Sequence, residues 1–375
     1  MKSRFTVLIL VFCGFACRQN YDPPVISSGA VFLVVEANLN PQGMTSILLT
    51  RSVPLGKGSA IKPESNAQVT VEGRDNSIRA LASIGNGRYN NSNLGLTVGE
   101  DYRLHIKTTD GRDYLSDYVK ARKSPVTDSI GYELESKGLR VQAYAHDVTK
   151  QTRYYRWDFD ETWEIHSQFP SIFIYDVPTK KIRPRVFPDE DVAICYKYET
   201  SSTINLANST KLLDDIIYKA PVQFIPSGSE KLGVRYSMLL RQYGLDKEAY
   251  NFYELMKKNT EEIGNIFSPQ PSEVRGNIRN PNDAKEYVLG YVTASTVEEK
   301  RIFIVIPWNF RQLCSSVKVP DNPDSINYFF GPGGYLIPYE YNPQPAIPPP
   351  YYMGSELPCV DCTRRGGNLT RPSYW

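Results

Sequence analysis

The sequence has little histidine and no excess of charge of either sign, and each shortage excludes a class of protein. Only three of the 375 residues are histidine, so no His-rich metal centre is expected. The 43 Lys and Arg face 41 Asp and Glu, and Lys2 and Arg4 belong to a segment that we expect to be removed. The mature chain is then neutral, which argues against a nucleic-acid-binding protein.

Familiar catalytic and cofactor motifs are also missing. The chain has no HExxH, no GxSxG, no P-loop and no GxGxxG after a strand, so no cofactor and no metal are expected. After the N-terminus no apolar run approaches 18 residues, so no later membrane-spanning helix is expected. What is abundant is tyrosine, with 26 residues, and proline, with 27. With short alternating apolar runs, this composition indicates a β-rich extracytoplasmic protein.

The N-terminus has the pattern of a bacterial lipoprotein. Residues 1–16 begin with two basic residues and continue as an apolar stretch too short to span a bilayer, which is typical of a signal peptide. Gly14-Phe15-Ala16 then precedes Cys17, so we expect cleavage there and lipidation of Cys17. Three acyl chains suffice for stable anchoring. The alternative is a soluble secreted protein; residues 17–29 would be a tether.

Four further cysteines remain, namely Cys195, Cys314, Cys359 and Cys362. An even number in an exported chain predicts two disulfides, with three possible connectivities. Cys359 and Cys362 form a CxxC, which suits a redox or zinc site in a cytosolic protein. No second CxxC exists and the histidines lie far away in sequence, so we favour a structural disulfide that fastens the C-terminal segment.

Residues 30–122 have the pattern of a β-sandwich of immunoglobulin-like or prealbumin-like type. The runs 31–37, 68–73 and 102–108 are β-branched or alternate with period two. Asp110-Gly111 separates two alternating runs, which is a strong hairpin signal. Several short strands at this spacing indicate a sandwich.

Residues 126–375 are predicted to form a larger β-rich domain with one inserted helix at about 246–263. Alternation is clear at 139–146 and 154–165, and further strands are expected near 192–198, 223–225, 235–242, 287–293 and 301–306. Asp246 is a good N-cap and Gly264 is placed to end the helix. The Pro-rich segment 320–358 is expected to be loop-like, and to wrap over the domain rather than dock on a partner.

Two sets of residues are candidates for function. A glycoside hydrolase needs paired carboxylates, and Asp158, Asp160, Glu161 and Glu164 lie close enough in one strand to supply them. Acidic residues on the wet face of a strand are common, so we favour a solvated face and name no catalytic residue. The candidate ligand or partner surface consists of Trp157, Trp163, Tyr351 and Tyr352.

The order of several short segments resembles a known family. The segments include Arg153-Tyr154-Tyr155-Arg156-Trp157, Arg235-Tyr236-Ser237, Val288-Leu289-Gly290-Tyr291 and the ending from Cys359 to Trp375. This arrangement resembles the Bacteroidota lipoproteins of domain-of-unknown-function family 4249, over nearly the whole mature chain. The resemblance implies a lipid-anchored envelope protein, often encoded beside TonB-dependent receptors. It implies no established activity and no catalytic residues.

We therefore expect a lipoprotein of the outer membrane that is not an enzyme. Its expected role is that of a binding or accessory module working with a TonB-dependent transporter. The expected partners are the membrane, through the lipid anchor, and that receptor or another envelope protein, with no nucleic acid. A structural role in envelope assembly and, with less support, a glycan hydrolase are the alternatives. Which face of the outer membrane carries the protein stays open.

Overall fold

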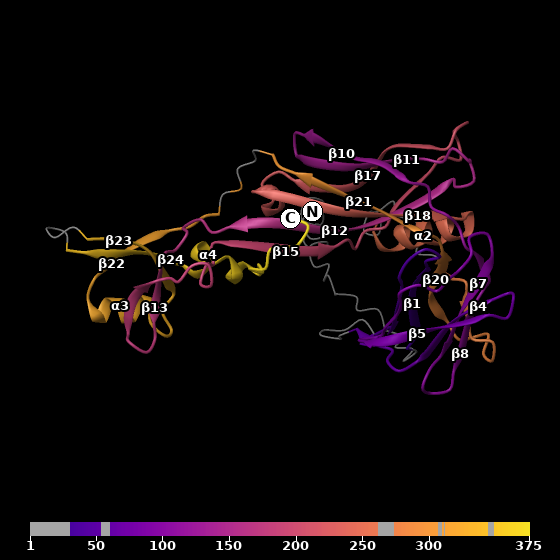
Figure 1. The fold of residues 1–375 in the computed structure, drawn as a ribbon, viewed down its shortest axis with the longest axis horizontal. Coiled ribbons are helices and arrows are strands. Elements are labelled where there is room, and N and C mark those ends of the chain that lie inside the picture. The colour runs from indigo at the N-terminus through magenta and orange to yellow at the C-terminus, as the bar shows by residue number, and fades with distance from the viewer. Residues whose placement is uncertain (1–30, 54–60, 262–273, 307–309, 311, 344–348) are drawn as a thin grey trace, which may run out of the picture.

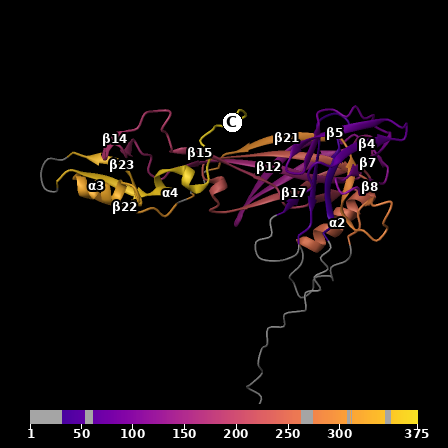
Figure 2. The ribbon, with the colours of Figure 1, turned by 90° about the horizontal axis from the view of Figure 1, so that it is seen from below.

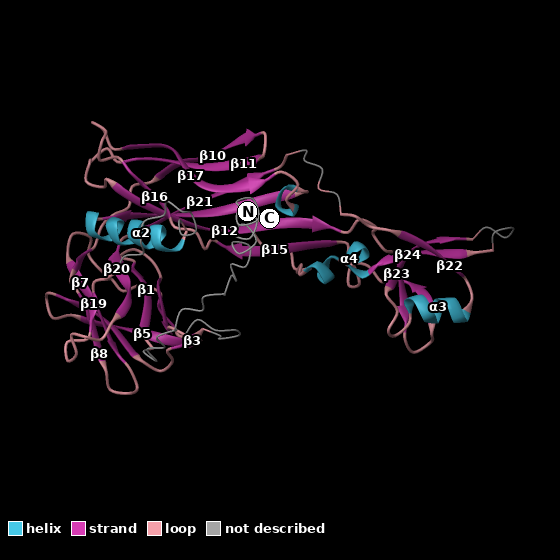
Figure 3. Ribbon diagram, turned by 180° about the vertical axis from the view of Figure 1, so that it is seen from behind, coloured by secondary structure: helices cyan, strands magenta, loops and turns pink. Residues whose placement is uncertain are grey.

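The computed structural model describes residues 31–53, 61–261, 274–306, 310, 312–343 and 349–375. The fold is mainly β, as predicted, and Figure 3 shows a few short helices among many strands. Three parts follow one another along an elongated molecule: a curled N-terminal sheet, a central sandwich and a distal lobe (Figure 1). The predicted signal segment, Cys17, the tether and Gly264 lie outside the described residues.

The N-terminal part is one sheet of 11 strands that curls around its own core. The alternation read from the sequence is confirmed, because Val69, Val71, Tyr102, Leu104 and Ile106 are all buried. The strands are β1 (Leu33–Leu39), β2 (Thr45–Arg51), β3 (Lys62–Pro63), β4 (Gln68–Gly73), β5 (Ile78–Gly85), β6 (Arg88–Asn91), β7 (Asp101–Lys107), β8 (Asp113–Ser116), β9 (Val119–Lys120), β19 (Ile278–Arg279) and β20 (Val288–Ala294).

Two of these strands come from late in the chain, which corrects the predicted division at residues 123–126. We assigned 287–293 to the larger domain, but β20 pairs in parallel with β1, and β19 pairs with β8. Gly290 lies opposite Val35 with a φ of +129°, and a Cβ there would lie 2.0 Å from the Val35 carbonyl oxygen. Glycine is thus required for this close approach. The N-terminal sheet is completed by the second half of the sequence.

The central part packs two sheets face to face. Leu139, Val141 and Ile225 of one sheet share a buried cluster with Trp157 and Met238 of the other. One sheet has β10 (Thr127–Glu135), β11 (Gly138–His146) and β17 (Ile216–Pro226). The other has β12 (Tyr154–His166), β15 (Ile194–Thr200), β16 (Asn205–Asn208), β18 (Arg235–Leu245) and β21 (Val297–Ile304), with the 3-10 turn η1 (Glu230–Leu232) between β17 and β18.

The predicted helix is α2 (Lys247–Thr260), and it joins the first two parts of the molecule. The Asp246 side chain caps it, because its Oδ1 accepts a hydrogen bond from the Ala249 backbone N–H at 2.8 Å. Phe252 contacts Tyr291 of β20 with ring centroids 5.1 Å apart, and Tyr250 contacts Tyr154 of β12 at 5.0 Å. The helix therefore packs against both sheets.

Replacement of Asp246 by alanine tests this cap. We expect Asp246→Ala to lower the free energy of unfolding by about 1 kcal/mol, the usual cost of losing an N-cap. Urea denaturation followed by circular dichroism measures the change. Asp189→Ala, at an exposed turn, is the control and should change little. Equal effects of the two substitutions would show that the cap contributes nothing.

The distal lobe corrects the prediction that 320–358 is loop-like. We define the distal lobe as residues 169–191, 312–343 and 349–360; it projects from one end of the sandwich (Figure 2). Val319, Ile326, Phe330 and Leu336 form a small buried cluster that the Pro-rich composition hides. The elements are β13 (Phe173–Asp176), β14 (Lys181–Pro184), β22 (Ser316–Pro320), α3 (Pro323–Phe330), β23 (Leu336–Asn342), β24 (Tyr351–Glu356) and α4 (Leu357–Val360), followed by η2 (Cys362–Arg365).

Candidate functional site

The acidic residues that suggested a hydrolase form ion pairs with basic side chains of the same chain. Asp158 and Asp160 share one face of β12, and a single guanidinium, that of Arg241 on β18, bridges them. The Arg241 Nε lies 2.5 Å from Asp158 Oδ1, and its Nη1 lies 2.5 Å from Asp160 Oδ2. The hydrogen bonds from Arg241 hold the pKa of Asp160 below its usual value, against the effect of burial. A general acid needs the opposite shift.

This bridge predicts a measurable pH effect. In Arg241→Gln we expect the pKa of Asp160 to rise, because its main stabilising charge is removed. A lowered folded-state pKa contributes stability above the unfolded value and loses it as the pH falls through the folded value. The native protein should therefore lose the stability contributed by Asp160 only below about pH 4. In the variant, the ionised Asp160 should contribute little stability at any pH. NMR titration of the Asp160 carboxyl measures the pKa, and an unchanged value would contradict the bridge.

Glu161 is on the opposite face of β12, where its contacts are those of a structural residue. Its side chain is 2% exposed, its Oε1 accepts a hydrogen bond from the Tyr236 hydroxyl at 2.5 Å, and its Oε2 pairs with Lys231 of η1. Lys231 also contacts Glu199 at 2.6 Å. Burial alone would lower the pKa of Lys231, but the hydrogen bonds to Glu161 and Glu199 outweigh it and raise that pKa. These contacts around the buried Glu161 fasten η1 to the sandwich.

The end of the sandwich and the root of the distal lobe line a cavity of about 250 Å³ that is partly open to solvent, which we call the junction cavity. Three separate segments supply its polar lining. Glu164 and His166 lie at the end of β12 and Gln168 follows it, Glu230 belongs to η1, and Gln312 and Arg365 come from the C-terminal part of the chain. Phe310 and Val234 add an apolar wall. Pockets at the junction of two structural units are common binding sites.

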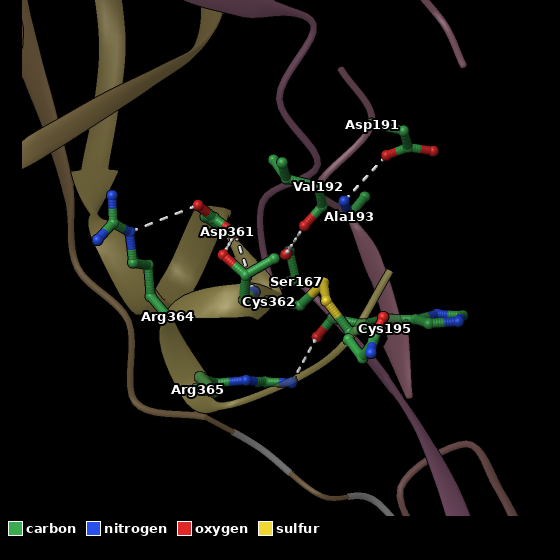
Figure 4. Close-up of a disulfide and its surroundings, with 12 residues drawn as sticks. Ser167, Asp191, Val192, Ala193, Cys195, Asp361, Cys362, Arg364 and Arg365 are labelled. Atoms are coloured by element: carbon green, nitrogen blue, oxygen red, sulfur yellow. Dashed lines mark hydrogen bonds and ion pairs between the residues drawn. A yellow bond between two sulfur atoms is a disulfide. The ribbon is translucent and has the colours of Figure 1, made fainter. Parts of the chain in front are cut away.

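Two disulfides fix the C-terminal side of this cavity. Cys195 of β15 is bonded to Cys362, and Cys314 is bonded to Cys359. The two disulfides predicted from the cysteine count are thus present, and the two halves of the CxxC have different partners. Figure 4 shows Arg365 beside the Cys195–Cys362 bond, pointing toward the strand. Each disulfide restrains a lining residue close to it in the chain, namely Gln312 two residues before Cys314 and Arg365 three residues after Cys362.

Arg365 is the most buried cation of the junction cavity. Its Nη1 donates a hydrogen bond to Gln312 Oε1 at 2.6 Å, its Nη2 donates to the His166 carbonyl oxygen at 3.3 Å, and its Nε lies 3.7 Å from Glu230 Oε2. The Nε atom is buried and has no hydrogen-bond partner among the described residues. Burial lowers the pKa of Arg365, with only partial compensation from Glu230.

Neighbouring groups already contact the two cavity carboxylates. Glu164 Oε1 lies 2.5 Å from His166 Nε2, and its Oε2 accepts a hydrogen bond from Trp375 Nε1 at 2.8 Å. Glu230 Oε1 accepts hydrogen bonds from Lys197 at 2.6 Å and from Trp163 Nε1 at 3.2 Å. Two tryptophans therefore report directly on the two carboxylates of the cavity.

Of the four aromatic residues predicted to form a ligand or partner surface, two lie in the core of the central sandwich and two lie in the distal lobe. Trp157 is 1% exposed and Trp163 is 8% exposed, so the prediction of a surface role for both was wrong. They share the parity of Phe159 and face the opposing sheet. Trp157 Nε1 donates a hydrogen bond at 2.9 Å to Oε1 of Gln242, which lies on the neighbouring strand β18 of the same sheet. Tyr351 and Tyr352 lie half-buried on β24 of the distal lobe.

Sequence reasoning missed the exposed apolar surface of the distal lobe. Tyr328 is 70% exposed and Tyr335 is 53% exposed, and four further apolar side chains of the lobe point to solvent: Ile172, Val177, Val186 and Phe187. The sequence contained one signal for this surface, the aromatic run Tyr328-Phe329-Phe330. Of these three residues, only Phe330 lies one helical turn after Ile326, and these two are the buried residues of α3. Clusters of exposed apolar side chains often mark interaction surfaces.

Within the described residues, no three His, Cys, Asp or Glu side chains gather in a position to hold a metal ion. The same part of the chain contains no helix with the length and apolarity to cross a membrane.

Comparison with known proteins gives a family but no activity. No curated protein matches the chain. A solved structure described as "Crystal structure of chicken CNTN1 FN1-FN3 domains" is similar, with 10% identity and a TM-score of 0.21 over 57% of this chain. The alignment covers 63% of that structure's own chain, and a TM-score this low carries no argument.

A family model described as "Domain of unknown function (DUF4249)" matches residues 18–301. This is the family predicted from the order of short segments, although the match ends before the Cys359–Trp375 segment that we had included. The chain therefore belongs to the DUF4249 family of domains of unknown function.

Proposed function

We propose that this protein is a lipoprotein of the bacterial outer membrane, anchored through Cys17, that acts as a binding module beside a TonB-dependent transporter. The apolar segment ending at Cys17 supports the anchor. The two disulfides support an oxidising compartment outside the cytoplasm. We also propose that the N-terminal part, which β19 and β20 complete, is a domain of immunoglobulin-like or prealbumin-like type.

The observation that carries the binding role is the distal lobe. The lobe projects away from the bulk of the chain (Figure 1). It exposes aromatic and aliphatic side chains, of which Tyr328 and Tyr335 are examples. Two disulfides fasten its root. A rigid projecting element with exposed aromatic side chains is suited to a partner surface, because aromatic anchors lose little conformational freedom on binding.

Site-specific photo-crosslinking in cells of the native host tests the partner. A photoreactive residue replaces Tyr328 on the lobe or, as a control, Tyr218 on β17; these tyrosines are 70% and 72% exposed. We expect position 328 to form an adduct with a TonB-dependent outer-membrane protein and position 218 to form none. Absence of an adduct at 328, or the same adduct at both positions, would contradict the proposal. Adducts with other envelope proteins alone would favour a structural role.

A further inference from the structure

We propose that one end of the central sandwich contacts a phospholipid bilayer through an apolar tip, which we define as Val148, Leu212 and Leu213. This contact is made by the protein itself, in addition to the proposed lipid anchor, and the inference rests on the proposed function for the presence of a membrane. Val148 is 80% exposed, Leu212 is 54% exposed and Leu213 is 89% exposed. Leucine and valine are among the residue types most often buried, so a group of three at this exposure indicates an interaction surface.

Two connections between strands form the apolar tip, and polar contacts hold them side by side. The turn between β11 and β12 carries Val148, and the loop between β16 and β17 carries both leucines. Lys150 Nζ of the turn lies 2.6 Å from Asp214 Oδ1 of the loop. Arg153 Nη1 donates a hydrogen bond to the Leu212 carbonyl oxygen at 3.2 Å. The three aliphatic side chains therefore belong to one surface, although more than 60 residues of sequence separate the turn from the loop.

The charges around the apolar tip suit a surface of phosphate headgroups. Lys150 and Lys211 are exposed, whereas Asp214 is the one exposed carboxylate of the turn 147–153 and the loop 209–215. Asp215 is 2% exposed, and the half-buried Asp147 accepts hydrogen bonds from four donors of its own turn. The exposed charge is therefore positive on balance. Lysines beside an aliphatic patch place ammonium groups at the headgroups while the apolar side chains enter the lipid.

The kind of side chain at the apolar tip favours a bilayer over a protein partner. Binding hot spots between proteins are enriched in Trp, Tyr and Arg, and Leu and Val are under-represented there. Leucine and valine partition favourably into bilayers. The three side chains together have about 11 apolar carbons, somewhat fewer than a myristoyl chain, which by itself binds a membrane only marginally. The apolar tip therefore orients a chain that is already tethered and does not replace the anchor.

The apolar tip and the distal lobe lie at opposite ends of β12. The turn that carries Val148 leads into Tyr154, the first residue of β12, and the lobe begins three residues after His166, the last. A strand of 13 residues is about 43 Å long. Figure 1 shows the distal lobe beyond the far end of this strand. With the apolar tip on the bilayer, the lobe and its exposed aromatic side chains point away from the lipid.

Co-sedimentation with vesicles tests the apolar tip without the anchor. The protein is the full mature chain with Cys17→Ser, which carries no acyl chain, and the vesicles contain phosphatidylethanolamine and phosphatidylglycerol. We expect saturable binding with half-saturation on the order of 1 mM lipid. Leu213→Glu should weaken it by about tenfold or more, because one leucine no longer enters the lipid. Leu313→Glu is the matched control: this leucine of the distal lobe is 98% exposed, and its replacement should leave binding unchanged.

An environment-sensitive fluorophore shows which part of the chain meets the lipid. Attached through Leu213→Cys it should shift to shorter wavelength when vesicles are added, and attached through Tyr328→Cys on the distal lobe it should not. Absence of vesicle binding, equal binding by the two glutamate variants, or a shift at position 328 would overturn the proposal. A dimer that Leu213→Glu abolishes, without vesicle binding, would overturn it in favour of a second copy of the chain. Because this protein carries no acyl chain, failure here is separate from failure of the anchor at Cys17 or of the crosslink at position 328.

Discussion

Replacement of Cys195 and Cys362 by alanine should lower the free energy of unfolding by about 5 kcal/mol, the largest effect we expect from removing a single link. The two residues are 167 positions apart, and both are fully buried in the core of the central sandwich. A cross-link over so long a loop restricts the unfolded chain strongly.

The second disulfide is the matched control. Cys314 and Cys359 are 45 positions apart, so the same argument gives about 4 kcal/mol for Cys314→Ala/Cys359→Ala. Urea denaturation followed by tryptophan fluorescence measures both losses. The chain-entropy account predicts the larger loss for the Cys195–Cys362 pair. A larger loss for the shorter loop, or no loss for either, would contradict it.

Lys231→Met should cost about 3–5 kcal/mol, because it leaves Glu161 charged and buried without its cationic partner. Glu161 is 2% exposed, and Tyr236 alone would remain close to its carboxylate, apart from a weak contact to Gln223 at 3.4 Å. The double variant Glu161→Gln/Lys231→Met removes both charges and should recover part of the loss. Denaturation of the single and double variants gives the coupling energy.

A surface pair supplies the control for this prediction. Lys219 and Glu133 are 42% and 53% exposed, so Lys219→Met should change stability by less than about 1 kcal/mol. The pH gives a further check. Because the pKa of Lys231 is raised, its contribution is complete below the ordinary lysine value and is lost as the pH rises through the folded-state value. The native protein and Lys231→Met should therefore converge only above about pH 10.5. Equal costs for the two lysine variants would contradict the buried pair.

Local signals in the sequence predicted the local structure well. Alternation placed Val69 and Val71 on a core face, and Asp246 marked the start of α2, because both features depend on near neighbours in the chain. The parity of 155, 157 and 159 was also visible. We nevertheless gave Trp157 a surface role, although the shared parity places it on the buried face with Tyr155 and Phe159.

Long-range pairing could not be predicted from the same signals. The alternation of β20 is compatible with any sheet, and its pairing with β1 joins residues more than 250 positions apart. The distal lobe was hidden for another reason: its core is small, and Pro320, Pro323, Gly331 and Gly333 lie between the members of that core in the sequence. The junction cavity depends on Glu164, Glu230 and Arg365 meeting from three segments, which no spacing in the sequence reveals.

The lipid anchor at Cys17 is the claim on which the proposed function depends most. Mass spectrometry of the N-terminal peptide, released from protein purified from the envelope of the native host, measures it directly. The account predicts a peptide that begins at Cys17 and carries the mass of three acyl chains. An unmodified peptide that begins at Met1, or one that contains an unacylated Cys17, would contradict it.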